Sequence, residues 1–233
     1  MAADPVKRIH LCMRSIAERS RRMPQRVDAK KIITHIISEI ERSKGWLSEI
    51  DGAVGDGDHG INMAKGCGMA LEKLDGVPDT FSDVFRLLGM TLLSNIGGAM
   101  GPIYGTFFMR MAKEAEGKEQ LNGEDLLRML EGALEGVKKR GGAEVGDKTL
   151  VDALQPARDR YEDALEVGKS MREAIDSMIA GAEAGMQSTK DLVAKKGRSS
   201  RLGERSKGTI DAGAASCYII LRAMGESLKN YVE

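Results

Sequence analysis

Three aspartates fall within eight residues of the segment that begins at Asp51, with glycines between them. Carboxylates this close repel one another unless a cation lies among them. The glycines let the backbone fold tightly enough for Asp51, Asp56 and Asp58 to converge. Because Mg²⁺ prefers oxygen ligands, the segment predicts a magnesium site. The alternative is that these residues only form turns and cap helices.

His59 follows the third aspartate and stands where a helix is expected to begin. A histidine there is a candidate donor to phosphate or to the ligand shell of the metal. The spacing of Gly55, Gly57 and Gly60 also fits the dinucleotide pattern GxGxxG, but the residues before it indicate a helix rather than the required strand. An EF-hand is excluded as well, because its twelfth position would be Cys67 rather than glutamate.

A second glycine cluster, residues 96–105, precedes an apolar stretch with helical spacing. Free amides at a helix start bind phosphate, although glycine clusters also occur where helices simply turn. No Walker A motif is present, since Asp147 rather than glycine precedes Lys148 and Thr149. The sequence also has no nucleophile elbow, so covalent catalysis has no support.

Apolar residues recur at helical spacing along most of the chain, and no segment alternates with the period of a strand. Asn122 and Ser170 are expected helix N-caps, Ser170 with Glu173 as a capping box. Glycine-bearing connections are expected at 55–60, 97–105 and 141–146, with a longer polar one at 195–213. Short connections favour antiparallel neighbours, so we predict an all-α bundle or barrel of about eight antiparallel helices. The expected core stripes include Ile32, Ile33, Ile36, Ile37, Ile40, Val84, Leu88, Leu126, Leu130 and Val137.

The composition indicates one folded domain, residues 1–233, with a basic N-terminal extension at 1–25. Hydrophobic residues make up 42% of the sequence, too many for a disordered chain. Lys plus Arg and Asp plus Glu each number 35, so no overall field favours nucleic acid or an anionic membrane. The three cysteines show no spacing typical of disulfides or zinc sites, and the sequence has no signal-peptide core. It also has no apolar run of about 18 residues, so we expect a cytoplasmic protein that does not span a membrane.

Several motifs, in a fixed order over residues 28–230, make the chain recognisable: it resembles the L subunit of dihydroxyacetone kinase, the nucleotide-binding half of that enzyme. The motifs are Gly55–Met63, Gly97–Ala99 with Gly101–Gly105, Gly146–Ala157, Leu202–Ser206 and Asp211–Ser216. The resemblance implies a barrel of eight antiparallel helices with the nucleotide pocket at one end. It also implies a kinase subunit that binds ADP or ATP.

The resemblance implies roles for individual residues. Asp51, Asp56 and Asp58 are expected to hold two Mg²⁺ ions that bridge the nucleotide phosphates, and His59 is the candidate catalytic residue. Two metal ions that neutralise phosphate charge suit phosphoryl transfer. The implied nucleotide-binding residues are His59, Gly60, Ile61, Asn62, Gly98, Ala99, Met100, Gly141, Leu150, Arg198, Asp211, Ala212 and Gly213.

The sequence departs from the family pattern at four positions near the implied pocket. Met100 replaces a usual serine, so that one phosphate-binding hydroxyl is missing and the loop must rely on backbone amides. Arg201 replaces a usual tyrosine, Thr209 a usual histidine and Ala212 a usual proline. These changes leave the partner and the substrate open, but they leave the three aspartates intact.

The resemblance also implies partners. The sugar, a short ketose such as dihydroxyacetone or erythrulose, would be held by a separate K-type subunit, and the chain is expected to form a homodimer. The phosphoryl donor would be free ATP, or an M-type phosphotransferase-system protein that recharges bound ADP. The motifs are compatible with both donors. The alternatives are a nucleotide-binding regulatory protein without catalytic activity and, less favoured, a phosphohydrolase, for which His59 is the only evident base.

Overall fold

The computed structural model describes residues 27–118 and 120–232, so the basic extension at 1–25 lies outside the described residues. These residues form eight α-helices and four 3₁₀ turns, and they contain no β-strand. The α-helices are α2 (Ala29–Gly52), α3 (His59–Leu71), α4 (Phe81–Asn95), α5 (Met100–Glu114), α6 (Gly123–Gly141), α7 (Val151–Glu166), α8 (Met171–Ser188) and α9 (Ala212–Leu228). The 3₁₀ turns are η1 (Leu74–Gly76), η2 (Thr189–Asp191), η3 (Ser199–Ser206) and η4 (Lys229–Tyr231).

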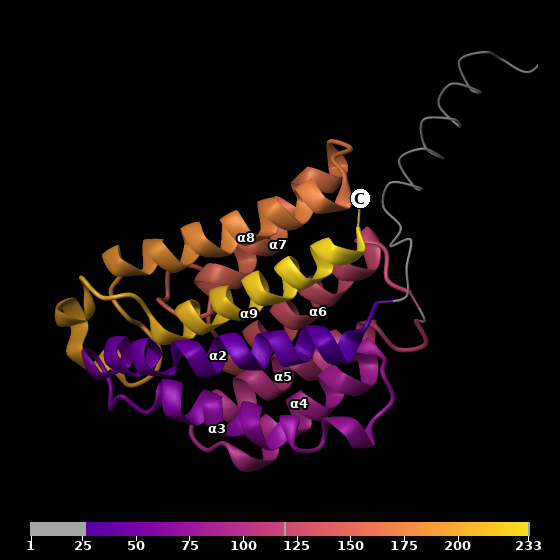
Figure 1. Cartoon of the computed structure of the whole chain (residues 1–233). Helices are drawn as coiled ribbons and strands as arrows, with labels where there is room; N and C mark the ends of the chain where they lie inside the picture. The colour runs from indigo at the N-terminus through magenta and orange to yellow at the C-terminus, as the bar shows by residue number, and fades with distance from the viewer. Residues whose placement is uncertain (1–26, 119, 233) are drawn as a thin grey trace, which may run out of the picture.

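The helices form a closed ring. Each helix packs against the next one along the chain, and α9 returns to pack against α2 (Figure 1). Successive helices are antiparallel because the connections between most of them are too short to span the length of a helix. The predicted all-α barrel of antiparallel helices is therefore confirmed.

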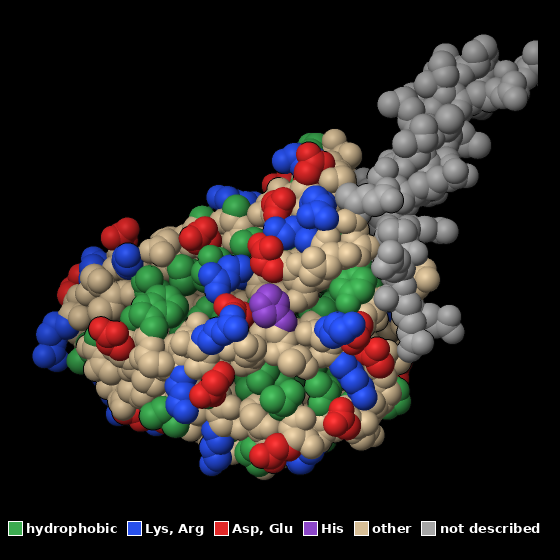
Figure 2. Space-filling view, in the orientation of Figure 1, with side chains coloured by type: hydrophobic (Ala, Val, Ile, Leu, Met, Phe, Trp, Pro, Cys, Tyr) green, Lys and Arg blue, Asp and Glu red, His purple; other side chains and the backbone are tan. Residues whose placement is uncertain are grey.

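The predicted apolar stripes line the interior of this ring. The five isoleucines of the predicted stripe, among the six of α2, are each at most 5% exposed, and they belong to one continuous core with the buried residues of α3, α4 and α9. Cys67 and Cys217 are free and buried as expected, whereas Cys12 lies outside the described residues. Among the described residues, no helix is long and apolar enough to cross a membrane. Figure 2 shows acidic and basic side chains interspersed over one face.

The predicted connection at 97–105 is wrong from residue 100 onward, because α5 begins at Met100. Two of the glycines there serve close helix packing rather than a turn. A Cβ at Gly101 would lie 2.0 Å from the carbonyl oxygen of Ile96, and one at Gly105 would lie 2.8 Å from Cβ of Leu93. The start of α5 can therefore approach the end of α4 only with glycine at these positions.

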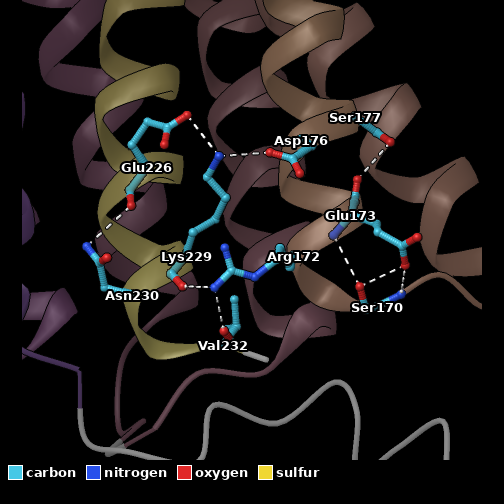
Figure 3. A network of polar contacts seen from close by, with 9 residues as sticks. All are labelled: Ser170, Arg172, Glu173, Asp176, Ser177, Glu226, Lys229, Asn230 and Val232. Carbon is cyan, nitrogen blue, oxygen red and sulfur yellow. Dashed lines mark hydrogen bonds and ion pairs between the residues drawn. The ribbon is translucent and has the colours of Figure 1, made fainter.

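Both predicted N-caps are confirmed. The side chains of Asn122 and Ser170 accept hydrogen bonds from the third residue of their helices, each in a complete capping box. At the C-terminal end of α9, Lys229 donates to Asp176 at 2.8 Å and to Glu226 at 2.9 Å, tying α9 to α8 (Figure 3). Arg172 donates there to the carbonyl oxygen of Val232 at 3.0 Å.

The antiparallel order places alternate helix ends together. Helices α3, α5, α7 and α9 begin at the end of the barrel where α2, α4, α6 and α8 finish, and the C-terminus labelled in Figure 1 lies at the opposite end. The N-terminus of a helix carries free amides and a partial positive charge. Four such N-termini lie at this end together with the C-termini of α2, α4, α6 and α8, so an anion is favoured there only where the free amides of an N-terminus face it.

Candidate functional site

The three aspartates converge at the junction of α2 and α3. Asp51 lies in the last turn of α2, Asp56 in the loop, and Asp58 at the N-cap of α3, where its side chain makes no capping hydrogen bond. One carboxylate oxygen from each lies within 4.8 Å of the others. Oδ2 of Asp51 is buried and has no hydrogen-bond partner among the described residues. A buried carboxylate oxygen is costly unless it binds a cation or accepts a hydrogen bond, and its place beside two further carboxylates fits Mg²⁺.

Glycines give the loop the shape that this convergence needs. The amide of Gly55 donates to the carbonyl oxygen of Asp51 at 2.6 Å, and a Cβ at Gly55 would lie 2.8 Å from Oδ1 of the same aspartate. Gly57 has φ +74°, a conformation that other residues adopt only with strain. The loop therefore turns back onto the end of α2 and brings Asp56 to Asp51.

Arg198, at the N-cap of η3, reaches this cluster from the other side of the barrel end. Its Nη1 forms an ion pair with Oδ2 of Asp56. Both side chains are about half exposed, so solvent weakens the attraction between them. The polar connection at 195–213 thus contributes to the site, as the resemblance implies, and it contains a 3₁₀ turn that the sequence did not predict.

His59 is the first residue of α3, and its ring is turned toward α9 and α5. Its Nε2 lies 2.8 Å from Oγ of Ser216, and its ring meets the ring of Tyr104 edge-on at 6.3 Å between centroids. Burial lowers the pKa of His59 to about 4, although the negative charge of Asp51 opposes the shift. The imidazole is therefore neutral at neutral pH. A Cβ at Gly60 would lie 2.0 Å from the carbonyl oxygen of Lys44, so glycine lets α3 begin against α2.

The predicted phosphate loop lies at the N-terminus of α5. Gly98 has φ +68°, and Ala99 is an N-cap whose side chain cannot accept a hydrogen bond. Nothing lies within 4 Å of a Cβ built at Gly97 or Gly98, so the loop borders open space. Met100 is the first residue of α5 and packs partly against the core. The amides of this loop are thus the groups available to an anion.

The N-terminus of α9 carries the next group of predicted residues. Asp211 is the N-cap and accepts a hydrogen bond from the amide of Ala214 at 2.8 Å. Burial raises the pKa of the Asp211 carboxyl to about 7, although this hydrogen bond and the charge of Lys148 oppose the shift. A Cβ at Gly213 would lie 3.5 Å from the amide nitrogen of Leu150. The starts of α7 and α9 therefore meet at this point.

Lys148 is a functional candidate that the sequence analysis missed. Its side chain is buried, and Nζ donates to the carbonyl oxygens of Thr189 and Thr209 at 2.6 Å each. Burial lowers the pKa of its ammonium group, although nearby aspartates, Asp211 first among them, oppose the shift. The lysine thus ties the loop before α7 to the segments on either side of η3. Only its place in the Gly146–Ala157 motif could have signalled this role.

Asp152, also missed, shapes the same loop. Its carboxylate is buried and accepts hydrogen bonds from the amides of Gly146 at 2.5 Å and Thr149 at 2.7 Å. These bonds hold the loop against the first turn of α7, where Leu150 is the N-cap.

The remaining predicted residues differ in how closely they are tied to the site. Gly141 ends α6 and faces Ile103 of α5, while Ala212 is buried as the first residue of α9. Asn62 lies in the first turn of α3, where its backbone amide donates to the carbonyl oxygen of Asp58. The side chain of Ile61, by contrast, is 53% exposed on the surface of α3.

The departures at Thr209 and Arg201 leave these contacts in place. Thr209 takes part through its carbonyl oxygen, which any residue would supply. Arg201 is exposed in η3.

Comparison with known proteins is consistent with this architecture. Residues 53–226 match the family model described as the DAK2 domain. The ADP-binding subunit DhaL of PEP-dependent dihydroxyacetone kinase 1 from Listeria innocua is 40% identical over 79% of this chain and 88% of its own length. The corresponding subunit from Escherichia coli is 38% identical over 79% of this chain and 88% of its length.

A solved structure is also similar. The dihydroxyacetone kinase of C. freundii, in complex with AMP-PNP and Mg²⁺, superposes with a TM-score of 0.65 and 25% identity over 85% of this chain. The chain spans 33% of that kinase's length. The extent of these matches places the chain in the DAK2-domain family, with the L subunits of dihydroxyacetone kinases.

Proposed function

We propose that this chain is the nucleotide-binding subunit of a kinase for short ketoses such as dihydroxyacetone. The observation that carries the proposal is the convergence of three aspartates, with one buried unpaired carboxylate oxygen, beside the N-termini of four helices. Carboxylates bind the metal, while helix N-termini bind phosphate. A site that combines carboxylates with helix N-termini suits a nucleoside diphosphate or triphosphate with its Mg²⁺. The names of the relatives from Listeria and Escherichia, both ADP-binding subunits, support this assignment.

The residues of this chain would share the work in phosphoryl transfer. Asp51, Asp56 and Asp58 hold two Mg²⁺ ions, whose chemistry is to neutralise the charge that builds up on the phosphates. The amides of Gly98, Ala99 and Met100 bind the phosphate oxygens without a side-chain hydroxyl.

Other parts of the pocket hold the rest of the nucleotide. His59, with Gly60 and Asn62, contacts the phosphates from the start of α3. Gly141 and Leu150 border the adenine, and Arg198 with Asp211–Gly213 completes the pocket. Because these groups are already positioned by helix termini, the chain acts by binding and orientation rather than through a covalent intermediate.

The substrate would be supplied by another protein. The relatives from Listeria and Escherichia are each named as one subunit of a dihydroxyacetone kinase, which supports a separate subunit for the ketose. We therefore propose a K-type subunit that holds the ketose against the nucleotide end of the barrel. ADP, named for both relatives, favours recharging by an M-type phosphotransferase-system protein over exchange of free ATP. The expected homodimer and the cytoplasmic location stay predictions.

Release of the bound nucleotide tests the proposal. The purified protein is denatured with and without prior dialysis against EDTA, and the supernatant is analysed by mass spectrometry. ADP that leaves only after chelation or unfolding supports a retained, metal-bound cofactor. Weak, reversible binding of Mg·ATP to a nucleotide-free protein would instead support an ATP-exchanging kinase. If neither nucleotide binds with Mg²⁺, the proposed function is wrong.

A catalytic role is separated from the regulatory alternative by reconstitution. The relatives compared above are named as kinases or kinase subunits, which favours catalysis. With a K-type subunit and a phosphoryl donor, the chain should support phosphorylation of dihydroxyacetone, and the Asp56→Asn variant should not. Nucleotide binding without any transfer in that mixture would favour the regulatory role.

A further inference from the structure

The loop that carries Arg198 is closed on itself by one buried side chain. Ser206, the last residue of η3, is 0% exposed. Its hydroxyl oxygen accepts a hydrogen bond from the backbone amide of Ala194 at 2.9 Å, and the hydroxyl donates to the carbonyl oxygen of Gly203 at 2.6 Å. Both directions are fixed, because a backbone amide can only donate and a carbonyl oxygen can only accept. Ser206 therefore joins the limb of the loop before Arg198 to the limb after it.

A bend within η3 shapes this closure. Gly203 has φ +54°, in the region that favours glycine, and its backbone departs there from helical geometry. The bend separates η3 into two turns, with Arg198 at the N-cap of the first and Ser206 at the end of the second. The motif Leu202–Ser206 supplies none of the predicted nucleotide-binding residues. Its bend and its buried hydroxyl instead give the loop a defined shape.

Backbone hydrogen bonds anchor the loop next to both ends of this closure. The amide of Lys195, which follows Ala194, donates to the carbonyl oxygen of Asp147 at 3.1 Å. On the other limb, the amide of Gly208 donates to the carbonyl oxygen of Lys190 at 2.8 Å. The bond between Ala194 and Ser206 links these two anchors. A buried hydrogen bond that joins two anchored limbs restricts the movement of the chain between them.

The ion pair of Arg198 with Asp56 does not by itself hold the guanidinium in place. The two side chains are 58% and 45% exposed, and an exposed ion pair is weak. We propose that Ser206 is a positioning residue, whose buried hydroxyl fixes the loop so that Arg198 faces Asp56 before a nucleotide binds. This inference rests on the proposed function, because it gives the guanidinium a phosphate to bind. A loop that is ordered on folding need not be ordered again on binding, and the affinity rises accordingly.

The closure is tested by NMR in the protein without nucleotide. Hydrogen exchange measures the protection of the Ala194 amide, whose acceptor is the side chain of Ser206. We expect this amide to be protected in the wild type and to lose its protection in Ser206→Ala. Rapid exchange in the wild type, or unchanged protection in the variant, would overturn the inference.

The same samples report where Arg198 points. The signal of its side-chain Nε–H is assigned by its loss in Arg198→Ala. The Asp56→Asn substitution should shift this signal in the wild-type background, because the guanidinium pairs with Asp56. In the Ser206→Ala background the shift should be lost. A shift of equal size in both backgrounds would show that Arg198 reaches Asp56 without the help of Ser206, and the inference would be wrong.

The same loop provides a matched control. The hydroxyl of Ser200 donates to the carbonyl oxygen of Gly197 at 2.7 Å. This bond is exposed and closes a single turn, so water can replace it and the two limbs stay joined. Ser200→Ala should therefore leave the protection of the Ala194 amide and the affinity for Mg·ADP unchanged. An effect equal to that of Ser206→Ala would show a general disturbance of the loop and count against the inference.

A double-mutant cycle tests whether Ser206 acts on the nucleotide through Arg198. Ser206→Ala should weaken Mg·ADP binding about 3- to 10-fold, the effect of one lost hydrogen bond, and by no more than Arg198→Ala does. In the Arg198→Ala background the same substitution should have no further effect, because the guanidinium that it positions is gone. A merely structural role of Ser206 would give additive effects and would contradict the inference.

A second variant keeps the test independent of how well Ser206→Ala folds. Nothing lies within 4 Å of a Cβ built at Gly203, so Gly203→Ala disturbs the loop only through its backbone conformation. It should weaken Mg·ADP binding in the wild-type background and have no effect beside Arg198→Ala; additive effects would again contradict the inference. If the wild type binds no Mg·ADP at all, the proposed function fails, while the two NMR measurements without nucleotide still decide whether Ser206 positions Arg198.

Discussion

Arg198 forms an ion pair with Asp56, one of the three aspartates that converge at the end of the barrel. Without a metal, the guanidinium brings the positive charge that the cluster of carboxylates needs. With Mg²⁺ and nucleotide bound as proposed, the metal would take over this task, and the guanidinium would become available to the phosphates. Under the proposed function, Arg198 would therefore compete with the metal in one state and assist the nucleotide in the other.

This relationship predicts opposite effects for the Arg198→Ala variant. Without nucleotide it should bind Mg²⁺ about 2- to 5-fold more tightly than the wild type, a small factor because the pair is half exposed. With Mg²⁺ present it should bind ADP more weakly, since it loses a phosphate-binding cation. Isothermal titration calorimetry measures both. Arg201→Ala, at an exposed arginine three residues along, should change neither affinity; equal effects in the two variants would contradict the prediction.

The metal assignment predicts a large effect of the Asp56→Asn substitution. The variant should bind Mg·ADP at least about 100-fold more weakly, because a direct ligand is lost rather than an outer contact. Its far-ultraviolet circular dichroism should match the wild type, since Asp56 lies in a loop and supports no helix. Asp163→Asn, at an exposed aspartate of α7, serves as the control. Wild-type affinity in Asp56→Asn would show that the metal lies elsewhere.

The eight helices were predictable because the sequence patterns that define a helix lie within a few neighbouring residues. A stripe such as Ile32 to Ile40 and a capping box such as Ser170 with Glu173 can be read within one or two turns. The aspartate cluster was predictable for the same reason, since its members lie within eight residues. Gly101 and Gly105 misled the prediction, because a glycine in the sequence does not reveal whether it serves a turn or a close helix contact.

The polar contacts behind the site could not be predicted, because they join residues that are far apart in the sequence. Ser216 meets His59 across 157 positions, and no local pattern records that the start of α9 lies beside the start of α3. Lys148 was missed for another reason. Lysine is usually exposed, so only the structure shows that this one is buried with two carbonyl partners.

The raised pKa of Asp211 predicts that its carboxyl group lowers the stability of the fold at neutral pH, although the residue is expected to take part in nucleotide binding. Its pKa, about 7 in the folded protein, lies above the value of 3.8 for an ordinary aspartate. The folded state therefore holds a proton that the unfolded state has lost between these two values. The stability that this carboxyl contributes is complete below pH 3.8 and is lost as the pH rises through 7. At neutral pH the ionised, partly buried Asp211 thus destabilises the fold.

Asp211→Asn should therefore be more stable than the wild type at pH 8, by on the order of 1–3 kcal/mol, with a much smaller difference at pH 4.5. The asparagine oxygen can still cap α9, so the helix keeps its start. Urea unfolding in EDTA at both pH values measures the difference. The variant should also bind Mg·ADP less tightly. A stability difference that is the same at both pH values would contradict the pKa shift.

Lys148 should matter for both folding and binding. In Lys148→Met the carbonyl oxygens of Thr189 and Thr209 lose their buried partner, at an expected loss of roughly 2–4 kcal/mol in the free energy of unfolding. The segment that leads into Asp211 should also move, since the amide of Asp211 donates to Oγ1 of Thr189 at 3.0 Å. Mg·ADP affinity should therefore fall at temperatures where the variant is fully folded.

Lys229→Met separates these two effects. Lys229 also has two oxygen partners (Figure 3), but it follows the C-terminal end of α9 and therefore lies at the opposite end of the barrel (Figure 1). Its loss should lower stability by about 1 kcal/mol or less, because its ion pairs are partly exposed, and should leave Mg·ADP affinity intact. Thermal unfolding measures the stability of both variants, and calorimetric titration measures their affinity for Mg·ADP. If Lys148→Met binds Mg·ADP as tightly as Lys229→Met does, the buried lysine supports the fold but does not position the nucleotide site.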